Sequence, residues 1–228
     1  MNVEIIPAIL PRDFAEIEQE IGLIHGFVKT IQIDVCDGQF TPTASWPYRK
    51  HDDSFDKLIH EQEGFPGWQD EDFEIDLMAN RPEELVDDWV MAGAARIIIH
   101  VEATGDIGKA IDSLQGRVEV GVALNEDTPI TILEEPRFGV HEGKVGFVQL
   151  MGIDRIGYQH QPFDDRVLGR IKEVRLKYPA MPISVDGGVL LETAPGLIAA
   201  GASRLVVGSA IFGAENAIDA IHSFKQLA

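Results

Sequence analysis

Two aspartates, Asp34 and Asp186, carry most of the chemistry that this sequence suggests. Each lies at the end of a short apolar run rich in β-branched residues, and each is followed within a few residues by glycine. If the two runs are strands on opposite sides of a barrel, the carboxylates can approach one bound carbon from two faces, one removing a proton while the other returns it. The pair therefore predicts an enzyme with acid and base groups. Asp37, directly before Gly38, is expected to serve as a turn residue instead.

The elements that must position these aspartates alternate regularly along the chain. Near-continuous apolar strands alternating with helical patterns favour a parallel sheet covered by helices, and eight repeats in 228 residues favour a closed (β/α)8 TIM barrel over a doubly wound open sheet. Apolar residues that recur at intervals of three and four positions predict helices, which include 14–24, 82–92, 167–178 and 214–227. The eight predicted strands are 3–8, 28–35, 73–78, 96–101, 118–124, 145–151, 183–185 and 205–207.

One segment departs from this alternation. Residues 43–72 contain Trp46, Trp68 and the acidic run 70–72, which is more chain than a minimal loop, helix and loop require. We predict a single barrel domain over residues 1–228 with an extended excursion at about 43–72 between the second and third strands. The excursion either reaches over the barrel mouth or packs its tryptophans on the barrel wall.

Composition limits the partners of this chain. There are 38 acidic residues against 19 basic ones, a formal net charge of −19, which argues against binding to nucleic acid or to an anionic membrane. No apolar run approaches the ~18 residues of a membrane span. The start of the chain shows no secretory leader pattern and Cys36 is the lone cysteine, so we expect a cytoplasmic protein without disulfides.

Two glycine turns could bind an anionic group in this acidic chain. Gly187 and Gly188 follow the seventh predicted strand, and Gly208 with Ser209 follows the eighth. The loops after the last two strands of a TIM barrel form a recurrent phosphate site, where backbone N–H groups hold the dianion. The sequence therefore predicts a phosphorylated ligand.

Seven segments occur in the order of one known protein family: 6–10 with 13–14, 34–42, 76–78, 100–102, 121–125, 185–188 and 208–212. On these segments the chain resembles the ribulose-phosphate 3-epimerase family over almost its whole length. The resemblance implies a ribulose-phosphate-binding barrel that acts on a ketose phosphate in carbohydrate metabolism, such as the pentose phosphate route. Epimerisation at carbon 3 would pass through an enediolate, with Asp34 and Asp186 exchanging roles as acid and base. Met78 and Met151 would keep the apolar lining of the substrate site, and we expect a homo-oligomer.

The chain differs from the family at two residues that would bind the metal. Family members usually hold a divalent ion with two histidines and the same two aspartates, whereas this chain has Gln32 and Asp76 at the histidine positions. A set of Asp34, Asp76, Asp186 and Gln32 offers only oxygen ligands, which favours magnesium, manganese or calcium over zinc. The alternative is no metal, in which case three carboxylates repel one another and raise at least one pKa.

The sixth-strand loop departs as well, since residues 154–163 keep one glycine of the family's phosphate-binding pattern. His160 or Arg155 in this loop is expected either to supply positive charge to the substrate phosphate or to face solvent. Three functions stay open at this point: an epimerase or isomerase of the family type, a related isomerase or lyase on another sugar phosphate, and a catalytically silent sugar-phosphate-binding barrel. Asp34 and Asp186 favour a catalytic function. Gln32, Asp76 and Ala8, which replaces a family serine, disfavour the standard epimerase reaction of the family.

Overall fold

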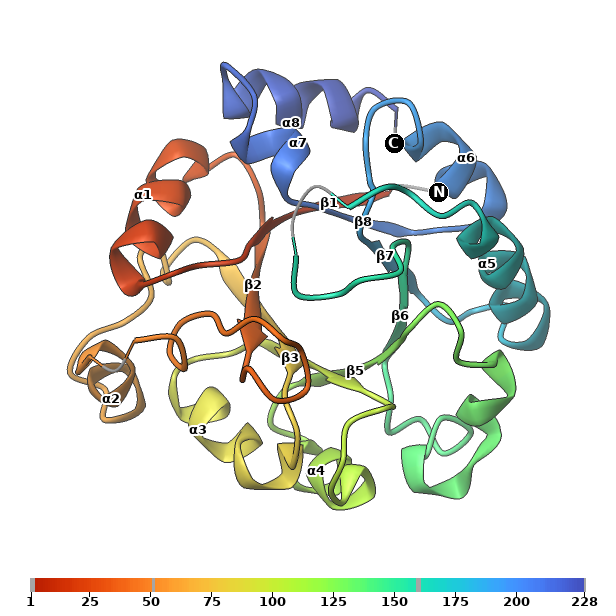
Figure 1. Ribbon diagram of the computed structural model, residues 1–228, viewed down its shortest axis with the longest axis horizontal. Coiled ribbons are helices and arrows are strands. Elements are labelled where there is room, and N and C mark those ends of the chain that lie inside the picture. Colours follow the sequence, from red (N-terminus) through yellow and green to blue (C-terminus); the bar gives the residue numbers. More distant parts are fainter. Residues whose placement is uncertain (1–2, 51, 159–160, 228) are drawn as a thin grey trace.

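A computed structural model, which describes residues 3–50, 52–158 and 161–227, shows a closed barrel of eight parallel strands inside a ring of helices (Figure 1). Each strand pairs with its neighbours in sequence, and β8 pairs in parallel with β1 to close the barrel. The predicted (β/α)8 barrel is therefore confirmed, and the open sheet is wrong. The strands are β1 (Glu4–Ile9), β2 (Thr30–Cys36), β3 (Asp72–Met78), β4 (Arg96–His100), β5 (Glu119–Leu124), β6 (Phe147–Met151), β7 (Ile183–Asp186) and β8 (Arg204–Val207).

The helices form the outer layer because each buries one apolar face against the strands. In α1, Asp13 caps the N-terminus by accepting the Glu16 N–H at 3.1 Å, and Ile17, Ile21 and Ile24 are buried at helical spacing. The α-helices are α1 (Phe14–Ile24), α2 (Ser54–Ile59), α3 (Val86–Met91), α4 (Ile107–Leu114), α5 (Arg166–Lys177), α6 (Ala194–Ala200), α7 (Ser209–Phe212) and α8 (Ala217–Lys225). Three 3₁₀ helices complete the set: η1 (Pro82–Glu84), η2 (Ile130–Glu134) and η3 (Pro136–Phe138).

Two predicted helices differ from the observed ones at their ends. The prediction over 82–92 resolves into η1 and α3, because Arg81 has a left-handed backbone (φ 54°) and Pro82 opens a separate 3₁₀ turn. The prediction over 214–227 contracts to α8, since the Asn216 side chain accepts the N–H groups of Ile218 and Asp219 and so fixes the first turn. Neither change moves a residue of the site described below.

Side chains fill the interior of the barrel below its mouth. Ile98, Ala123 and Phe147 form an apolar cluster inside the strands. Gly121 leaves the space for this ring, since a Cβ there would lie 2.4 Å from the Cζ atom of Phe147. The guanidinium of Arg204 lies over the same ring, 4.1 Å from its centroid. The interior is therefore a packed core, and the C-terminal ends of the strands are left to form the site.

The excursion between β2 and β3 packs mainly against the barrel wall. Trp46 is fully buried, its Nε1–H donates to the hydroxyl of Ser54 at 2.7 Å, and its ring contacts Phe55 and Trp89 edge-on. Helix α2 lies in the outer ring (Figure 1), and Trp68 is 63% exposed. Of the two predicted arrangements, packing on the barrel wall is the one that most of the segment adopts.

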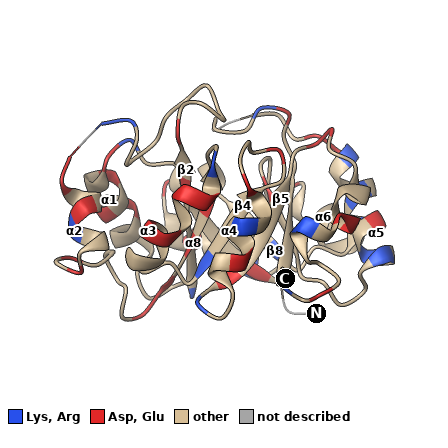
Figure 2. Cartoon of the chain, turned by 90° about the horizontal axis from the view of Figure 1, so that it is seen from below, with Lys and Arg blue, Asp and Glu red and all other residues tan. Residues whose placement is uncertain are grey.

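Acidic side chains are spread over the outer helices and the loops (Figure 2), as the net charge of −19 requires. Across the described ranges, each helix is too short or too polar to cross a membrane.

Candidate active site

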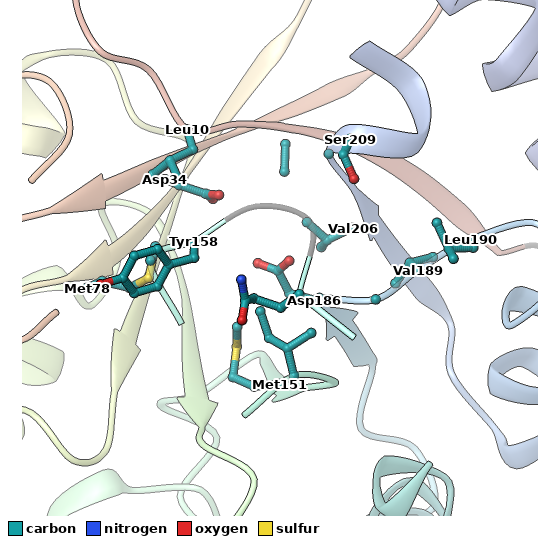
Figure 3. A pocket seen from close by; sticks show the side chains of 17 residues that line it. Leu10, Asp34, Met78, Met151, Tyr158, Asp186, Val189, Leu190, Val206 and Ser209 are labelled. Carbon is teal, nitrogen blue, oxygen red and sulfur yellow. The ribbon is translucent and has the colours of Figure 1, made fainter. Parts of the chain in front are cut away.

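Three aspartates converge at the mouth of the barrel. Asp34 and Asp76 are direct register partners on the neighbouring strands β2 and β3, and Asp186 ends β7. One carboxylate oxygen from each lies within 4.8 Å of the others. The carboxylates of Asp34 and Asp186 point into one pocket from opposite sides (Figure 3). The structure thus brings together the acidic residues that the sequence placed at strand ends.

Two glutamine amides link these carboxylates. The Gln32 Nε2 group donates to Asp34 Oδ1 at 2.7 Å and to Asp186 Oδ2 at 2.8 Å, so one nitrogen bridges the two aspartates. The Gln149 Nε2 group donates to Asp76 Oδ2 at 3.2 Å and to Asp186 Oδ2 at 3.4 Å. Both glutamines are fully buried. The carboxylates are therefore fixed in orientation before any ligand enters.

His100 holds the remaining oxygen of Asp76. Its Nε2 atom lies 3.2 Å from Asp76 Oδ1, and neither side chain is exposed. On the other side of the ring, Nδ1 faces Glu102 Oε2 at 3.8 Å. Burial lowers the pKa of His100, but the Asp76 carboxylate outweighs it and the pKa rises to about 10. An imidazolium beside Asp76 offsets part of the negative charge of the cluster.

Burial also changes the protonation of the two opposed aspartates. Burial first, and then the charges of Asp186 and Asp76, raise the pKa of Asp34 well above its ordinary value. The pKa of Asp186 rises to about 7 for the same reasons, with burial the larger cause and Asp76 the next. Two carboxyl groups that repel one another in a buried site retain a proton between them near neutral pH.

The pocket in front of these aspartates has a volume of about 290 Å³. Met78 and Met151 supply apolar surface, and the described lining contains no lysine or arginine. Arg155 is exposed and lies outside this lining, and the predicted ligand-binding residue His160 lies outside the described residues. Of the predicted ligand-binding residues, the pocket brings together Met78, Met151, Gly187, Gly188, Gly208 and Ser209.

The glycines after β7 and β8 are required by close approaches. Gly187 and Gly188 have φ values of 95° and 68°, and added Cβ atoms would lie 2.6 Å from Ile153 Cγ1 and 2.8 Å from Phe163 Cα, respectively. A Cβ at Gly208 would lie 3.3 Å from the carbonyl oxygen of Ala8. Side chains at these positions would therefore crowd the edge of the pocket. Glycine leaves this edge open, so that the backbone can lie close to a bound ligand.

Asp37 takes the turn role that the sequence predicted for it. Its Oδ1 atom accepts the N–H groups of Gln39 and Phe40, each at 2.7 Å, and its Oδ2 atom accepts the N–H of Asn80 at 2.9 Å. Cys36 is fully buried, and burial raises the pKa of its thiol to about 12. The thiol is therefore a packing group rather than a nucleophile.

The donor set at the mouth fits an oxygen-preferring divalent ion. Asp34, Asp76 and Asp186 offer carboxylate oxygens within 4.8 Å of one another, and Gln32 Oε1 is buried without a hydrogen-bond partner among the described residues. A half turn of the Gln32 amide would exchange its nitrogen for this oxygen. Carboxylate and amide oxygens suit hard cations. Among the described residues of the cluster, no pair of histidines stands where the family has its metal-binding histidines. The nearby His100 is directed to Asp76.

Sequence reasoning missed Gln149, Tyr158 and Gln161. Gln149 is a single polar residue in an otherwise apolar strand, and strict inward alternation along β6 could have placed it beside the aspartates. Tyr158 and Gln161 line the pocket from the loop after β6. The unusual composition of that loop could have indicated ligand-binding residues there, but the sequence analysis selected Arg155 and His160 instead.

Comparison with known proteins agrees with this arrangement. A model described as the Ribulose-phosphate 3 epimerase family matches residues 4–212. The ribulose-phosphate 3-epimerase of Bacillus subtilis (strain 168) is 32% identical over 230 residues, covering 98% of this chain and 98% of that relative. The ribulose-phosphate 3-epimerase of Schizosaccharomyces pombe (strain 972) is 28% identical over 233 residues, covering 99% of this chain and 93% of that relative.

Solved structures share the barrel at lower identity. A structure of KGPDC from Streptococcus mutans has a TM-score of 0.73 at 14% identity and covers 100% of this chain and 97% of that one. A 3-hexulose-6-phosphate synthase has a TM-score of 0.68 at 21% identity, covering 98% of this chain and 99% of that one. At these identities the likeness concerns the fold alone.

Proposed function

The chain belongs to the ribulose-phosphate 3-epimerase family, and we propose that it epimerises a ketose phosphate by moving a proton next to the carbonyl. The observation that carries this proposal is the pair of opposed carboxylates, Asp34 and Asp186, which share the amide nitrogen of Gln32 at 2.7 and 2.8 Å and face one pocket. Inversion at a carbon needs a group on each of its faces, and this pair supplies both.

The two carboxyl groups must be in different protonation states when the substrate enters. One, ionised, removes the proton from carbon 3, and the electron pair moves onto the carbonyl to form an enediolate. The other, protonated, returns a proton to the opposite face. Burial and neighbouring carboxylates raise the pKa of both Asp34 and Asp186, so without a metal the pair retains one proton near neutral pH, with one group protonated and the other ionised as epimerisation requires.

The phosphate is proposed to bind at the backbone of the loops after β7 and β8. The described pocket lining offers no cationic side chain, so Gly187, Gly188, Gly208 and Ser209 are the proposed contacts through N–H groups. This position leaves the sugar chain to run past Met78 and Met151 toward the aspartates. The two methionines also keep water away from the enediolate.

The metal is proposed to be magnesium, manganese or another oxygen-preferring ion, held by Asp34, Asp76, Asp186 and Gln32. A bound divalent ion would supply positive charge next to the oxygens of the enediolate. Without a metal, the N–H groups of Gln32 lie between the two opposed aspartates and partly offset their negative charge.

Isotope exchange tests the acid and base roles. The Asp34→Asn and Asp186→Asn variants keep the side-chain shape and remove the proton acceptor. We expect exchange of the carbon-bound proton of ribulose 5-phosphate with deuterated solvent to fall by ~10²-fold or more in each variant, because a general base contributes about that factor. The measurement is NMR in D₂O, with circular dichroism to confirm folding. Undiminished exchange in both variants would remove the assignment.

A second candidate function, a sugar-phosphate-binding barrel without catalysis, is favoured by the environment of Asp76. Both of its oxygens accept hydrogen bonds, from His100 and Gln149, where the family's pattern has a metal-binding histidine. The two functions differ in wild-type protein, since the silent barrel would bind ketose phosphates without any exchange of their carbon-bound protons.

A further inference from the structure

Gln149 lies behind the aspartates of the mouth, in the layer between the packed core and the pocket. On the same face of β6, Phe147 belongs to the apolar cluster inside the barrel and Met151 lines the pocket. Gln149 itself is fully buried and is not part of the described pocket lining. Its side chain therefore faces the carboxylates of Asp76 and Asp186 rather than the space for a substrate.

The amide of Gln149 is incompletely satisfied as a hydrogen-bonding group. Its Oε1 atom is buried and has no hydrogen-bond partner among the described residues. Its Nε2 atom lies 3.2 Å from Asp76 Oδ2 and 3.4 Å from Asp186 Oδ2. Because hydrogen bonds from N–H to oxygen usually span about 2.7–3.2 Å, both contacts are at or beyond the long end of that range. A buried amide with an unpaired oxygen and two long contacts is unfavourable unless another group completes it.

The same distances match the spacing of oxygens that share one cation. A hard divalent ion binds oxygen at about 2.1–2.5 Å, which places two ligands at right angles about 3.0–3.5 Å apart. A half turn of the Gln149 amide would bring Oε1 close to the present position of Nε2. The oxygen would then have this spacing from both Asp76 Oδ2 and Asp186 Oδ2.

The two carboxylate oxygens next to Gln149 are also the ones that an ion could use. Asp76 Oδ1 faces His100 Nε2 at 3.2 Å, so Oδ2 is the oxygen of Asp76 that remains for a cation. Asp186 Oδ2 accepts from the amides of both Gln32 and Gln149. Both amides have a buried Oε1 without a hydrogen-bond partner in the described parts of the chain. The two glutamines therefore have the same relation to this carboxylate.

We propose that Gln149 is a further ligand of the divalent ion, through its Oε1 atom. This inference rests on the metal of the proposed function, but it does not depend on the epimerase reaction. Together with the four ligands proposed above, Gln149 gives the ion five oxygen-bearing side chains. Five oxygens fill most of an octahedral shell and leave one position for water or substrate.

Manganese binding in the absence of substrate tests the proposal. Mn²⁺ is the probe, because the electron paramagnetic resonance signal of the free ion falls as the ion binds to protein. We expect Gln149→Leu to raise the Kd for Mn²⁺ by ~10-fold or more, since even groups that only orient a metal ligand contribute about that factor. Leucine suits this position because the other residues of β6 are apolar. Val148→Ala, a truncation at a buried position on the opposite face of β6, is the matched control and should leave the Kd unchanged.

A crystal structure of the manganese-loaded wild type distinguishes a ligand from a group that merely orients the carboxylates. We expect Gln149 Oε1 to lie about 2.1–2.5 Å from the anomalous peak of the ion. An unchanged or lower Kd in Gln149→Leu overturns the proposal, and so does a loaded structure in which the Gln149 nitrogen still faces Asp76 and Asp186. If wild type binds no Mn²⁺, this inference and the proposed metal both fail, while the epimerase reaction is still decided by the exchange of the carbon-bound proton.

Discussion

At the scale of single residues, Asp76 is the position where this chain differs most in its chemistry from the family pattern. Its two oxygens accept from His100 at 3.2 Å and from Gln149 at 3.2 Å, and all three side chains are fully buried. A carboxylate is a harder ligand than an imidazole and favours harder ions. We therefore expect the substitution to change which ion the site prefers, while Asp34 and Asp186 stay in place.

Restoring histidines at the two family positions tests this reasoning. The double variant Gln32→His, Asp76→His gives the cluster two imidazole donors, so we expect its zinc affinity to rise by at least ~10-fold over wild type. Zinc content is measured by mass spectrometry after equal exposure of both proteins to zinc and removal of the excess. Tight stoichiometric zinc in wild type would contradict the oxygen-rich site. The single variant Cys36→Met, at another buried position on β2, is the control for changes in packing.

The sequence predicted the convergence of Asp34, Asp76 and Asp186 because parallel strands end at the same edge of a barrel. Alternation along β6 could have placed Gln149 on the inward face, but not its donation to two of these aspartates. That contact depends on side-chain geometry, which the fully buried run 147–151 leaves undefined. The ion pair of Asp76 with His100 also depends on the register between β3 and β4, which the apolar pattern leaves undefined.

At the scale of elements, the loop after β6 contacts the start of the β2–β3 excursion at the mouth. We call this loop, residues 152–164, the β6 strap, of which 152–158 and 161–164 are described. Their described side-chain link is the hydrogen bond from the Thr43 hydroxyl to Gly157 O. The Thr41 hydroxyl supports it by donating to Thr43 O at 2.9 Å. This contact explains how a segment that otherwise packs on the barrel wall can influence the pocket.

Removing that hydrogen bond should loosen the strap without removing Tyr158. Thr43→Val keeps the shape and loses the donor, so we expect faster amide hydrogen exchange in the strap, by ~5-fold, since a hydrogen bond of this kind contributes about 1 kcal/mol. Peptide-level mass spectrometry reports on the described strap residues. Thr104→Val, at an exposed threonine in the loop after β4, is the control and should leave strap exchange unchanged. Equal exchange in Thr43→Val and wild type would show that this hydrogen bond does not hold the strap.

Strand order and helix positions followed from the alternation of elements, and the phosphate-binding type of barrel followed from the glycine turns and the family resemblance. The ends of the elements could not be predicted in this way. Pro82 starts a 3₁₀ turn inside a periodic stretch, and Asn216 starts α8 later than periodicity indicates. Both are local hydrogen-bonding effects that leave the apolar spacing unchanged. The path of the excursion depended on whether its tryptophans found buried partners, which requires the three-dimensional arrangement.

At the scale of the whole molecule, charges also cross the interior of the barrel at the end opposite to the site. Glu74 on β3 lies 3.0 Å from Arg204 on β8 and 3.5 Å from Arg96 on β4, and Glu4 on β1 contacts both arginines. These contacts tie four strands together across the barrel. The expected homo-oligomer and cytoplasmic location stay predictions, since they depend on surfaces and surroundings outside a single chain.

Glu74 should make the stability of the whole barrel depend on pH. Burial outweighs the two arginines and raises the pKa of Glu74 to about 7, from an ordinary value of 4.5. A raised carboxyl pKa means that the folded protein holds the proton more tightly than the unfolded chain. The contribution of this group to stability is therefore complete below pH 4.5 and is lost as the pH rises through about 7.

Comparison of wild type with Glu74→Gln isolates this contribution, because glutamine keeps the shape and an oxygen for Arg204 but does not ionise. Between pH 4.5 and pH 8, we expect the unfolding free energy of wild type to fall relative to that of Glu74→Gln, by up to about 3 kcal/mol. Urea unfolding at several pH values measures the difference. Glu119→Gln, which removes a partly exposed partner of Arg96, is the control and should give a difference below ~1 kcal/mol. Parallel pH profiles for wild type and Glu74→Gln would mean that Arg204 and Arg96 keep Glu74 ionised, so that attraction rather than burial governs the interior of this barrel.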